Sequence, residues 1–122
     1  MAKSDFRSGC SIARTLDVVG DKWTLLIVRD LLWHGKQTFQ TLEASAEAMP
    51  TNILSDRLKR LMKWKLVARD AYQQNPVRYA YRLTDEGRAL EPVLLQIMAF
   101  GHEHLGGGRY DPKTGQHFKA AR

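Results

Sequence analysis

The stretch PTNILSDRLKRLMKWKLVARD, residues 50–70, decides how the rest of the chain is interpreted. Leu54, Leu58 and Leu61 recur at the i, i+4 and i+7 spacing of one helical face, which predicts an amphipathic helix over residues 51–64. At the helical interval of about 100° per residue, the opposite face is polar. It carries Asn52, Ser55, Asp56, Lys59, Arg60 and Lys63. A charged helix face is usually only solvated, so the neighbouring sequence has to decide whether this one binds a partner.

The basic charge of the chain is concentrated in the same region. The 122 residues carry a formal net charge of +6. Residues 50–84 hold eight of the 19 Lys and Arg residues and two of the 13 acidic residues, which accounts for the whole excess. Such localisation points to a polyanionic partner, with nucleic acid as the first expectation and an anionic membrane surface as the second.

Length and composition predict one folded domain with a single modest core. The N-terminus MAKSDFRSGC lacks the apolar segment of a signal peptide, and no apolar run is long enough to cross a bilayer. Cys10 is the single cysteine of the sequence, which excludes an internal disulfide framework and fits a reducing compartment. We therefore expect a cytoplasmic protein with no membrane association.

The segments on either side of the basic helix complete a recognisable motif. A short helix is predicted from Thr38 to about Ala46, followed by a turn over residues 47–50 that lacks the glycine often found there. Two short helices joined by a tight turn describe a helix-turn-helix over residues 38–64. The period changes after Lys65, so residues 66–72 are predicted to form a strand, and the alternation in residues 78–83 predicts a second one. With its tip at residues 73–77, this hairpin makes the motif a winged helix.

Helices are also expected at both ends of the motif. The first runs from Cys10 to Val19, and Asp21 caps a second, core helix over residues 22–33. Thr84 caps a last helix that reaches about residue 105 and is kinked at Pro92. The predicted fold class is α+β: a winged helix-turn-helix domain over residues 10–105 with N- and C-terminal dimerisation helices. Residues 1–9 and 106–122 are expected to be flexible.

The predicted DNA contacts follow from position on these elements. They are Thr51, Asn52, Ser55, Lys59, Arg60, Lys63, Arg78 and Lys36. Asn52 and Ser55 lie near the helix start, where side chains meet base edges, and Asn pairs bidentately with adenine. The basic side chains further along are expected to hold phosphates. Thr51 is explained equally well as the N-cap residue. Arg57 falls inside the apolar arc, which favours a structural ion pair with a carboxylate of a neighbouring helix, and Arg82 is explained equally well as a solvated strand residue.

The ordered series of motifs resembles the HxlR family of bacterial winged-helix transcription regulators. The series is CSIARTLDVVGDKWTLLIVRDLL, TFQTL, TNILSDRLKRL, LVARD and RYAYRLTDEG, and it covers the chain from about Cys10 to about Gly101. The resemblance implies a homodimeric, cytoplasmic DNA-binding regulator without enzymatic activity or cofactor, whose terminal helices form the dimer. Two parts depart from the family pattern: the segment ASAEAM, residues 44–49, is less typical, and the tail beyond Leu105 is not covered.

Cys10 is the second predicted site. A lone cysteine is commonly inert, but this one precedes a helix N-terminus, which stabilises a thiolate. In several family members the matching cysteine senses oxidants or electrophiles, which leaves a modified thiol or a Cys10–Cys10 bridge between subunits. The four histidines form no recognisable metal site.

The sequence therefore predicts a repressor that binds a palindromic DNA operator as a homodimer and responds to a small-molecule or electrophile effector. The alternative is a winged-helix module whose basic helix faces a protein or RNA. An enzyme or ligand carrier is disfavoured because the sequence shows no catalytic constellation.

Overall fold

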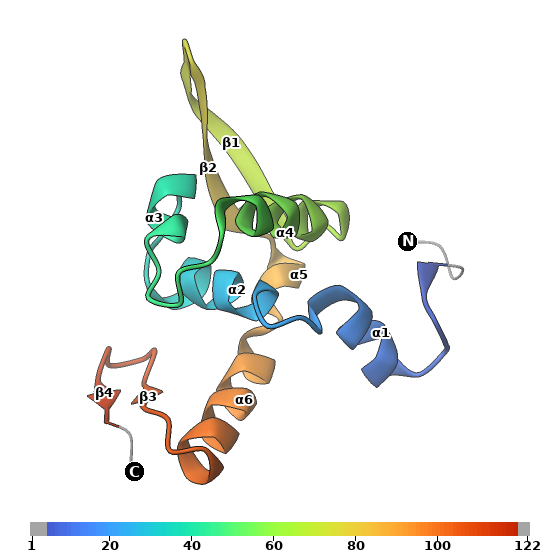
Figure 1. The fold of residues 1–122 in the computed structure, drawn as a ribbon, viewed down its shortest axis with the longest axis vertical. Coiled ribbons are helices and arrows are strands. Elements are labelled where there is room, and N and C mark those ends of the chain that lie inside the picture. The colour runs from blue at the N-terminus through green and yellow to red at the C-terminus, as the bar shows by residue number, and fades with distance from the viewer. Residues whose placement is uncertain (1–4, 120–122) are drawn as a thin grey trace. The chain divides into compact units, whose positions relative to one another are not determined.

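A computed structural model of the protein describes residues 5–119 (Figure 1). The chain divides into two compact units, residues 1–88 and 89–122. The elements of the first unit are α1 (Ser11–Val19), α2 (Thr24–Trp33), α3 (Phe39–Glu43), α4 (Thr51–Lys63), β1 (Val67–Gln74), β2 (Val77–Leu83) and α5 (Asp85–Arg88). Those of the second are α6 (Glu91–His104), β3 (Arg109–Tyr110) and β4 (His117–Phe118). The α3–α4 pair followed by the β1–β2 hairpin confirms the predicted winged helix-turn-helix.

The core of the first unit forms around the apolar face of α4. Leu54, Leu58 and Leu61 are at most 1% exposed, as the i, i+4 and i+7 spacing requires of a core-facing stripe. They belong to one buried set with Ile27, Val28, Leu42, Met49, Val67, Tyr81 and Leu83. Burying this face fixes α4 in the fold and leaves its polar side chains outward.

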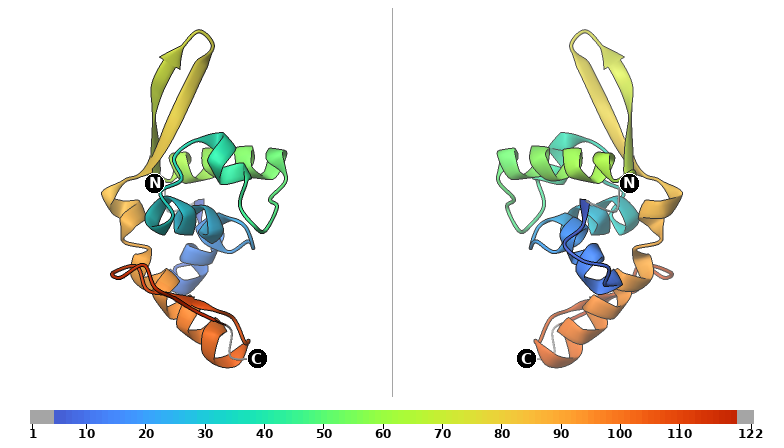
Figure 2. Two further views of the ribbon diagram at one scale, coloured as in Figure 1. Left: turned by 90° about the vertical axis from the view of Figure 1, so that its left-hand side faces the viewer. Right: turned by 90° about the vertical axis from the view of Figure 1, so that its right-hand side faces the viewer.

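The wing is an antiparallel hairpin that runs from the pair Val67–Leu83 to the pair Gln74–Val77. Both views in Figure 2 show it projecting beyond the helices of the first unit. The backbone N–H of Tyr81 donates to the Gln37 carbonyl oxygen at 2.6 Å, and Thr38 forms a bridge with Ala80. These bonds attach the chain just before α3 to the wing, so the helix-turn-helix and the hairpin are joined at the base.

Helix ends largely follow the sequence. The Gly20 N–H donates to the Leu16 carbonyl oxygen at 2.8 Å at the end of α1. The Asp21 carboxylate then accepts from the N–H groups of Trp23 and Thr24 at the start of α2, but the N-cap position belongs to Trp23 and the helix begins at Thr24, two residues later than predicted. Thr38 and Thr41 form a reciprocal capping box at the start of α3.

The single kinked helix predicted over residues 84–105 is wrong. Thr84 accepts a hydrogen bond from the Gly87 N–H at 3.1 Å, but the helix that it starts, α5, ends at Arg88. Pro92 lies in the first turn of a separate helix, α6. Proline has no N–H and a φ suited to a first turn, so it begins a helix here instead of kinking one.

The second unit consists of α6 and the described part of the tail. Residues 109–118, within the stretch predicted to be flexible, carry a short β3–β4 hairpin. Its turn forms because the Asp111 carboxylate accepts from the Lys113 N–H at 2.9 Å and Gly115 adopts a φ of +74°. The Tyr110 N–H approaches the Met98 sulfur at 3.3 Å, which attaches the hairpin to α6. None of the helices within residues 5–119 combines the length and apolarity that crossing a bilayer demands.

Candidate nucleic-acid interface

The exposed side of α4 presents a polar row. Asn52, Lys59 and Lys63 are exposed and Ser55 is half-buried, so the structure brings these four predicted residues onto one helix. Lys63 also lies 5.5 Å from the centre of the Trp64 ring. This face combines an amide and a hydroxyl near the helix start with two ammonium groups further along.

Thr51 is not the N-cap residue of α4. Pro50 occupies that position, and the helix has no side-chain cap. The Thr51 hydroxyl instead donates to the carboxylate of Glu43, which ends α3. The explanation of Thr51 as a cap is therefore wrong, and its side chain links the two helices of the helix-turn-helix.

Two arginines of α4 are engaged by carboxylates. The Nε of Arg57 donates to Asp21 at 2.9 Å and its Nη1 contacts Asp56, which confirms the predicted structural ion pair. Arg60, predicted to hold a phosphate, has nitrogens 3.7 Å from Asp21 and 3.9 Å from Asp56. Arg60 is thus drawn towards the same acidic pair, a contact that the helical pattern alone did not indicate.

Asp21 is held ionised by these partners. Burial opposes its charge, but hydrogen bonds from the Thr24 hydroxyl, Arg57 and the Trp23 N–H outweigh that effect and lower the pKa of Asp21 to about 2. The hydrogen bond to Asp21 correspondingly raises the pKa of Arg57. At neutral pH both groups are charged, so their contact is an ion pair.

Lys36, predicted as a phosphate anchor, faces an interior polar cluster instead. Its ammonium donates to the Ser45 hydroxyl at 2.8 Å and lies 3.6 Å from the carboxylate of Asp30, a residue only 2% exposed. A buried carboxylate needs charged and hydrogen-bonded partners, and Lys36 supplies one of them. Lys36 is thus engaged within the fold, and its contact with a DNA phosphate stays a prediction.

The same cluster shapes the turn between α3 and α4. The guanidinium of Arg29 donates to both carboxylate oxygens of Glu47, at 2.9 and 2.8 Å, and Ser45 donates to Asp30. Ala48 in this turn has a φ of +54°, a conformation usually left to glycine. Contacts from α2 hold the turn where a glycine is missing. An Asp inside the apolar stretch of residues 24–33 was the sequence signal for this cluster.

The wing adds one exposed guanidinium near its tip. Arg78 is exposed, whereas Arg82 is paired with Asp70 at 3.0 Å, and Arg69 lies 3.9 Å from the centre of the Tyr79 ring. Arg78 also lines an open cleft of about 280 Å³ together with Thr38 and Gln40 of the α3 start. The wing tip and the start of α3 therefore border one surface.

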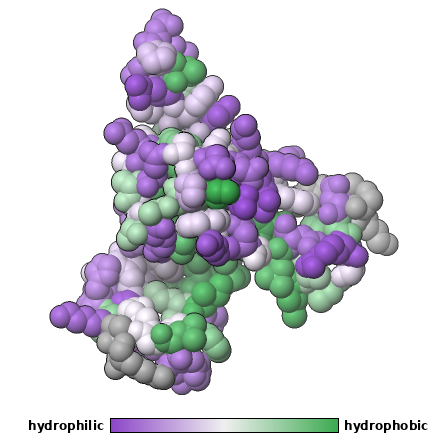
Figure 3. All heavy atoms as spheres, in the orientation of Figure 1, coloured by the Kyte–Doolittle hydropathy of each residue, from purple (hydrophilic) through white to green (hydrophobic). Residues whose placement is uncertain are grey.

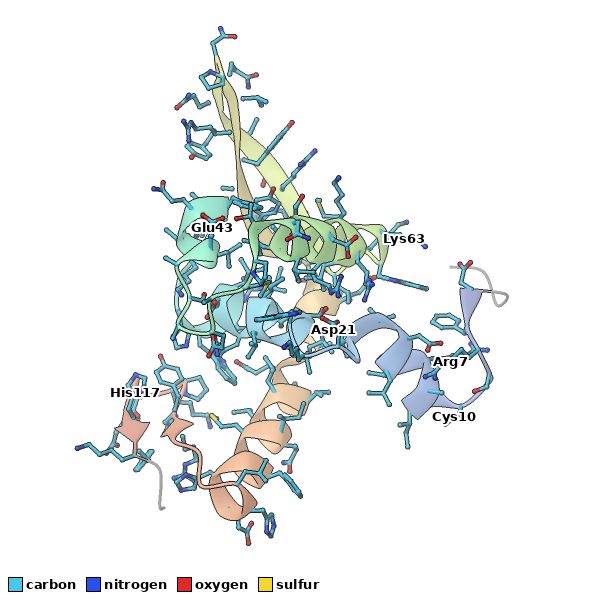
Figure 4. All side chains as sticks on the ribbon, viewed as in Figure 1. Arg7, Cys10, Asp21, Glu43, Lys63 and His117 are labelled. Atoms are coloured by element: carbon cyan, nitrogen blue, oxygen red, sulfur yellow. The ribbon has the colours of Figure 1, made fainter. Side chains whose placement is uncertain are left out.

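Cys10 occupies the N-cap position of α1 and is exposed. The nearby backbone N–H groups of Ala13 and Ile12, at the start of α1, lower the pKa of its thiol. Figure 4 shows Cys10 at the start of α1 near Arg7. The predicted placement at a helix N-terminus is confirmed, and sensing by this thiol stays a prediction. Among residues 5–119, no group of three or more His, Cys, Asp and Glu side chains could hold a metal ion.

Two helices carry exposed apolar side chains. On α1, Ile12 and Leu16 are 73% and 52% exposed, and on α6, Val93, Ile97 and Phe100 are 38%, 51% and 59% exposed. Figure 3 shows hydrophobic surface over parts of each helix. Contiguous exposed apolar side chains of this kind mark interaction surfaces.

Comparison with known proteins agrees with this geometry. Residues 18–108 match the profile of the HxlR-like helix-turn-helix family. The chain is similar to the HTH-type transcriptional regulator YvaP of Bacillus subtilis, with 39% identity over 92 residues that make up 75% of this chain and 84% of the relative.

Solved structures of two regulators are also similar to it. The redox regulator HypR in its oxidized form has 32% identity and a TM-score of 0.67, with 78% of this chain and 97% of that chain covered. The reduced form of the transcriptional regulator YodB from B. subtilis has 25% identity and a TM-score of 0.65, with 84% and 100% covered.

Proposed function

The chain belongs to the HxlR-like helix-turn-helix family of transcriptional regulators, which are not enzymes, and on that premise we propose that it is a repressor binding a palindromic DNA operator as a homodimer. One observation carries the proposal: the polar row of α4, with Asn52 and Ser55 near the helix start and Lys59 and Lys63 beyond. A helix that is buried on one side and basic on the other suits insertion into the major groove. The proposed place of action is the cytoplasm.

In the proposed complex each protomer reads one half-site. Asn52 pairs with an adenine edge, while Lys59 and Lys63 hold phosphates and fix the register of α4 on the duplex. Arg78 on the wing contacts the flanking backbone or the minor groove. Two protomers related by a two-fold axis read half-sites about 34–36 Å apart, one turn of the duplex.

The homodimer is supported by the apolar side chains on α1 and α6. Burying residues such as Ile97 and Phe100 against a second copy removes apolar surface from water, at about 25 cal/mol per Å². Symmetric pairing is also the commonest assembly of such proteins, and it gives the two-fold axis that a palindromic operator needs.

The test is fluorescence anisotropy of reduced protein on duplex from upstream of its own gene and on scrambled duplex, over a salt series. We expect tighter binding to the upstream duplex and a steep loss of affinity with salt. Equal weak binding to both, or no salt dependence, would contradict the proposal and favour a protein or RNA partner for the basic helix.

Two substitutions should distinguish residues that recognise bases from residues that contact phosphates. Asn52→Ala should cost about 1–3 kcal/mol on the preferred duplex and relax the base preference at one position of each half-site. Lys59→Ala should weaken binding to every sequence and reduce the salt slope by about one unit, because one phosphate is no longer neutralised. Anisotropy on a panel of single-base operator variants measures both effects. If the two variants behave alike, the assigned roles are wrong.

We further propose that oxidants or electrophiles regulate the protein through Cys10. Support comes from the exposed thiol, its lowered pKa and the similarity to a redox regulator. Alkylation by iodoacetamide, in which the thiolate sulfur displaces iodide, should change DNA affinity about fivefold or more, the lower end of ordinary coupling between sites. Cys10→Ser, treated identically, is the control and should not respond. Equal affinity of alkylated and reduced wild type would remove this role.

A further inference from the structure

The residues just before and just after α1 in the sequence both contact α4. Gly20 ends α1, and the next residue, Asp21, contacts Arg57 in the middle of α4 and Arg60 in its last turn. On the other side of α1, the Phe6 ring lies 5.1 Å from the ring of Trp64, the C-cap residue of α4. The position of α1 and the position of the proposed recognition helix are therefore connected at two separate points.

Asp21 is suited to transmit position because its carboxylate is fixed on several sides. Both its oxygens are used: the Trp23 and Thr24 N–H groups and the Thr24 hydroxyl hold it to the start of α2, and Arg57 reaches it at 2.9 Å. Thr24 is fully buried. Figure 4 shows Asp21 beneath α4. A movement of this carboxylate would therefore pull directly on the guanidinium of Arg57.

The connection from α1 to Asp21 through Gly20 is short and tightly packed. The N–H of Gly20 bonds to the Leu16 carbonyl oxygen, and a Cβ at Gly20 would lie 2.2 Å from that same oxygen. The end of α1 is thus closed tightly on itself just before Asp21. A rotation of α1 cannot be absorbed in a long linker, because a single residue separates Val19, the last of the helix, from Asp21.

The segment before α1 is folded onto the helix as well. The Arg14 guanidinium lies 4.7 Å from the Phe6 ring centre and donates to the Ser8 carbonyl oxygen at 2.8 Å, and Arg7 pairs with Asp17. Phe6 therefore moves with α1, and its contact with Trp64 forms the second connection.

We propose that α1 positions the recognition helix, with Asp21 as the positioning residue that fixes α4 through Arg57 and Arg60. This inference rests on the proposed DNA-binding function and adds a role for side chains that touch no DNA. Bidentate contacts to base edges need a fixed helix orientation, whereas the electrostatic attraction to the phosphates is independent of sequence. Loss of Asp21 should therefore reduce the preference for the operator more than it reduces binding to duplex in general.

Asp21→Asn gives an expected result that simple destabilisation does not. Affinity for the upstream duplex should fall about tenfold, equivalent to about 1.4 kcal/mol. Affinity for scrambled duplex should stay unchanged or rise, because the variant gains one positive charge and Arg60 loses a carboxylate partner. Partial unfolding would instead lower both apparent affinities by the same factor, so the ratio of the two affinities isolates positioning.

Three further variants complete the anisotropy experiment. Glu86→Gln on α5 makes the same charge change and should keep the operator preference. In an Arg57→Gln background, Asp21→Asn should have a smaller effect than in wild type, because the contact with Arg57 is already lost and only that with Arg60 remains. Phe6→Ala removes the second connection and should lower the operator preference about two- to tenfold, as loss of one aromatic pair does. If Asp21→Asn does not fold, this variant tests the positioning role by itself.

The outcomes are distinguishable. An unchanged preference in both Asp21→Asn and Phe6→Ala, or additive effects of Asp21→Asn and Arg57→Gln, overturns the positioning role while leaving the proposed function intact. If wild-type protein itself shows no preference for the upstream duplex, the proposed function falls, and the positioning role falls with it. A preference that falls about tenfold in Asp21→Asn, persists in Glu86→Gln and depends less on Asp21 once Arg57 is replaced supports the inference.

Discussion

Replacing Ile97 by Glu is expected to lower the affinity for the upstream duplex about a hundredfold while leaving the protomer folded. Ile97 is 51% exposed on α6, so a carboxylate there meets water in the isolated chain and should cost little stability. In the proposed homodimer the same carboxylate would be buried against an apolar surface without a partner, which is strongly unfavourable. A protein that cannot dimerise loses the gain from engaging two half-sites together, commonly a factor of about 10² or more.

Sedimentation and anisotropy together measure this effect. The Ile97→Glu variant should sediment as a monomer at concentrations where wild-type protein is dimeric, with an unchanged circular dichroism spectrum. Ala99→Glu is the matched control, since it makes the same charge change at an exposed position of α6 about 160° round the helix from Ile97 and at least 100° from Val93 and Phe100. A monomeric variant that still binds the operator as wild type does would show that dimerisation through α6 is not needed.

Gly87→Ala should reduce the free energy of unfolding by about 1–3 kcal/mol, the usual cost of forcing an extra methyl group into a packed site. A Cβ at Gly87 would lie 2.0 Å from the Leu66 carbonyl oxygen and 2.9 Å from a methyl carbon of Leu83. The first of these atoms belongs to the backbone and cannot rotate away. Since Leu66 precedes β1 and Leu83 ends β2, the displacement should reach the base of the wing.

Urea denaturation followed by tryptophan fluorescence measures the loss. Gly101→Ala is the control, because Gly101 is also helical but has nothing within 4 Å of the added methyl group. Alanine is favoured over glycine in a helix by about 0.8–1 kcal/mol, so this variant should be as stable as wild type or more stable. Equal stability of Gly87→Ala and wild type would mean that α5 can shift away from the strands without cost.

The helices and the wing could be predicted because their signals are local. Leu54, Leu58 and Leu61 share a helical period, and residues 78–83 alternate, so the element types follow from spacing alone. The Asp21 carboxylate could be placed at the start of the second helix because an Asp there accepts from helix N–H groups, although Trp23 holds the N-cap position. Arg57 was recognisable as an ion-paired residue because an Arg inside an apolar arc needs a carboxylate.

The sequence pattern could not show contacts that join distant parts of the chain. Lys36 looked like an available surface cation, but Asp30 and Ser45 bring it into the fold. Arg60 lies on the predicted DNA face by helical phase, yet Asp21 lies close enough to attract it. At Pro92 the signal was local but ambiguous, since proline in a helical pattern is compatible with a kink or with a new start.

The turn of the helix-turn-helix owes its shape to a helix outside the motif. Arg29 and Asp30 of α2 hold Glu47 and Ser45, and Ala48 keeps a left-handed conformation with no glycine to ease it. Residues 38–64 therefore depend on α2 for the conformation of their turn. A chimaera that carried residues 38–64 into another protein without α2 would keep the sequence of the helix-turn-helix but not the angle between α3 and α4.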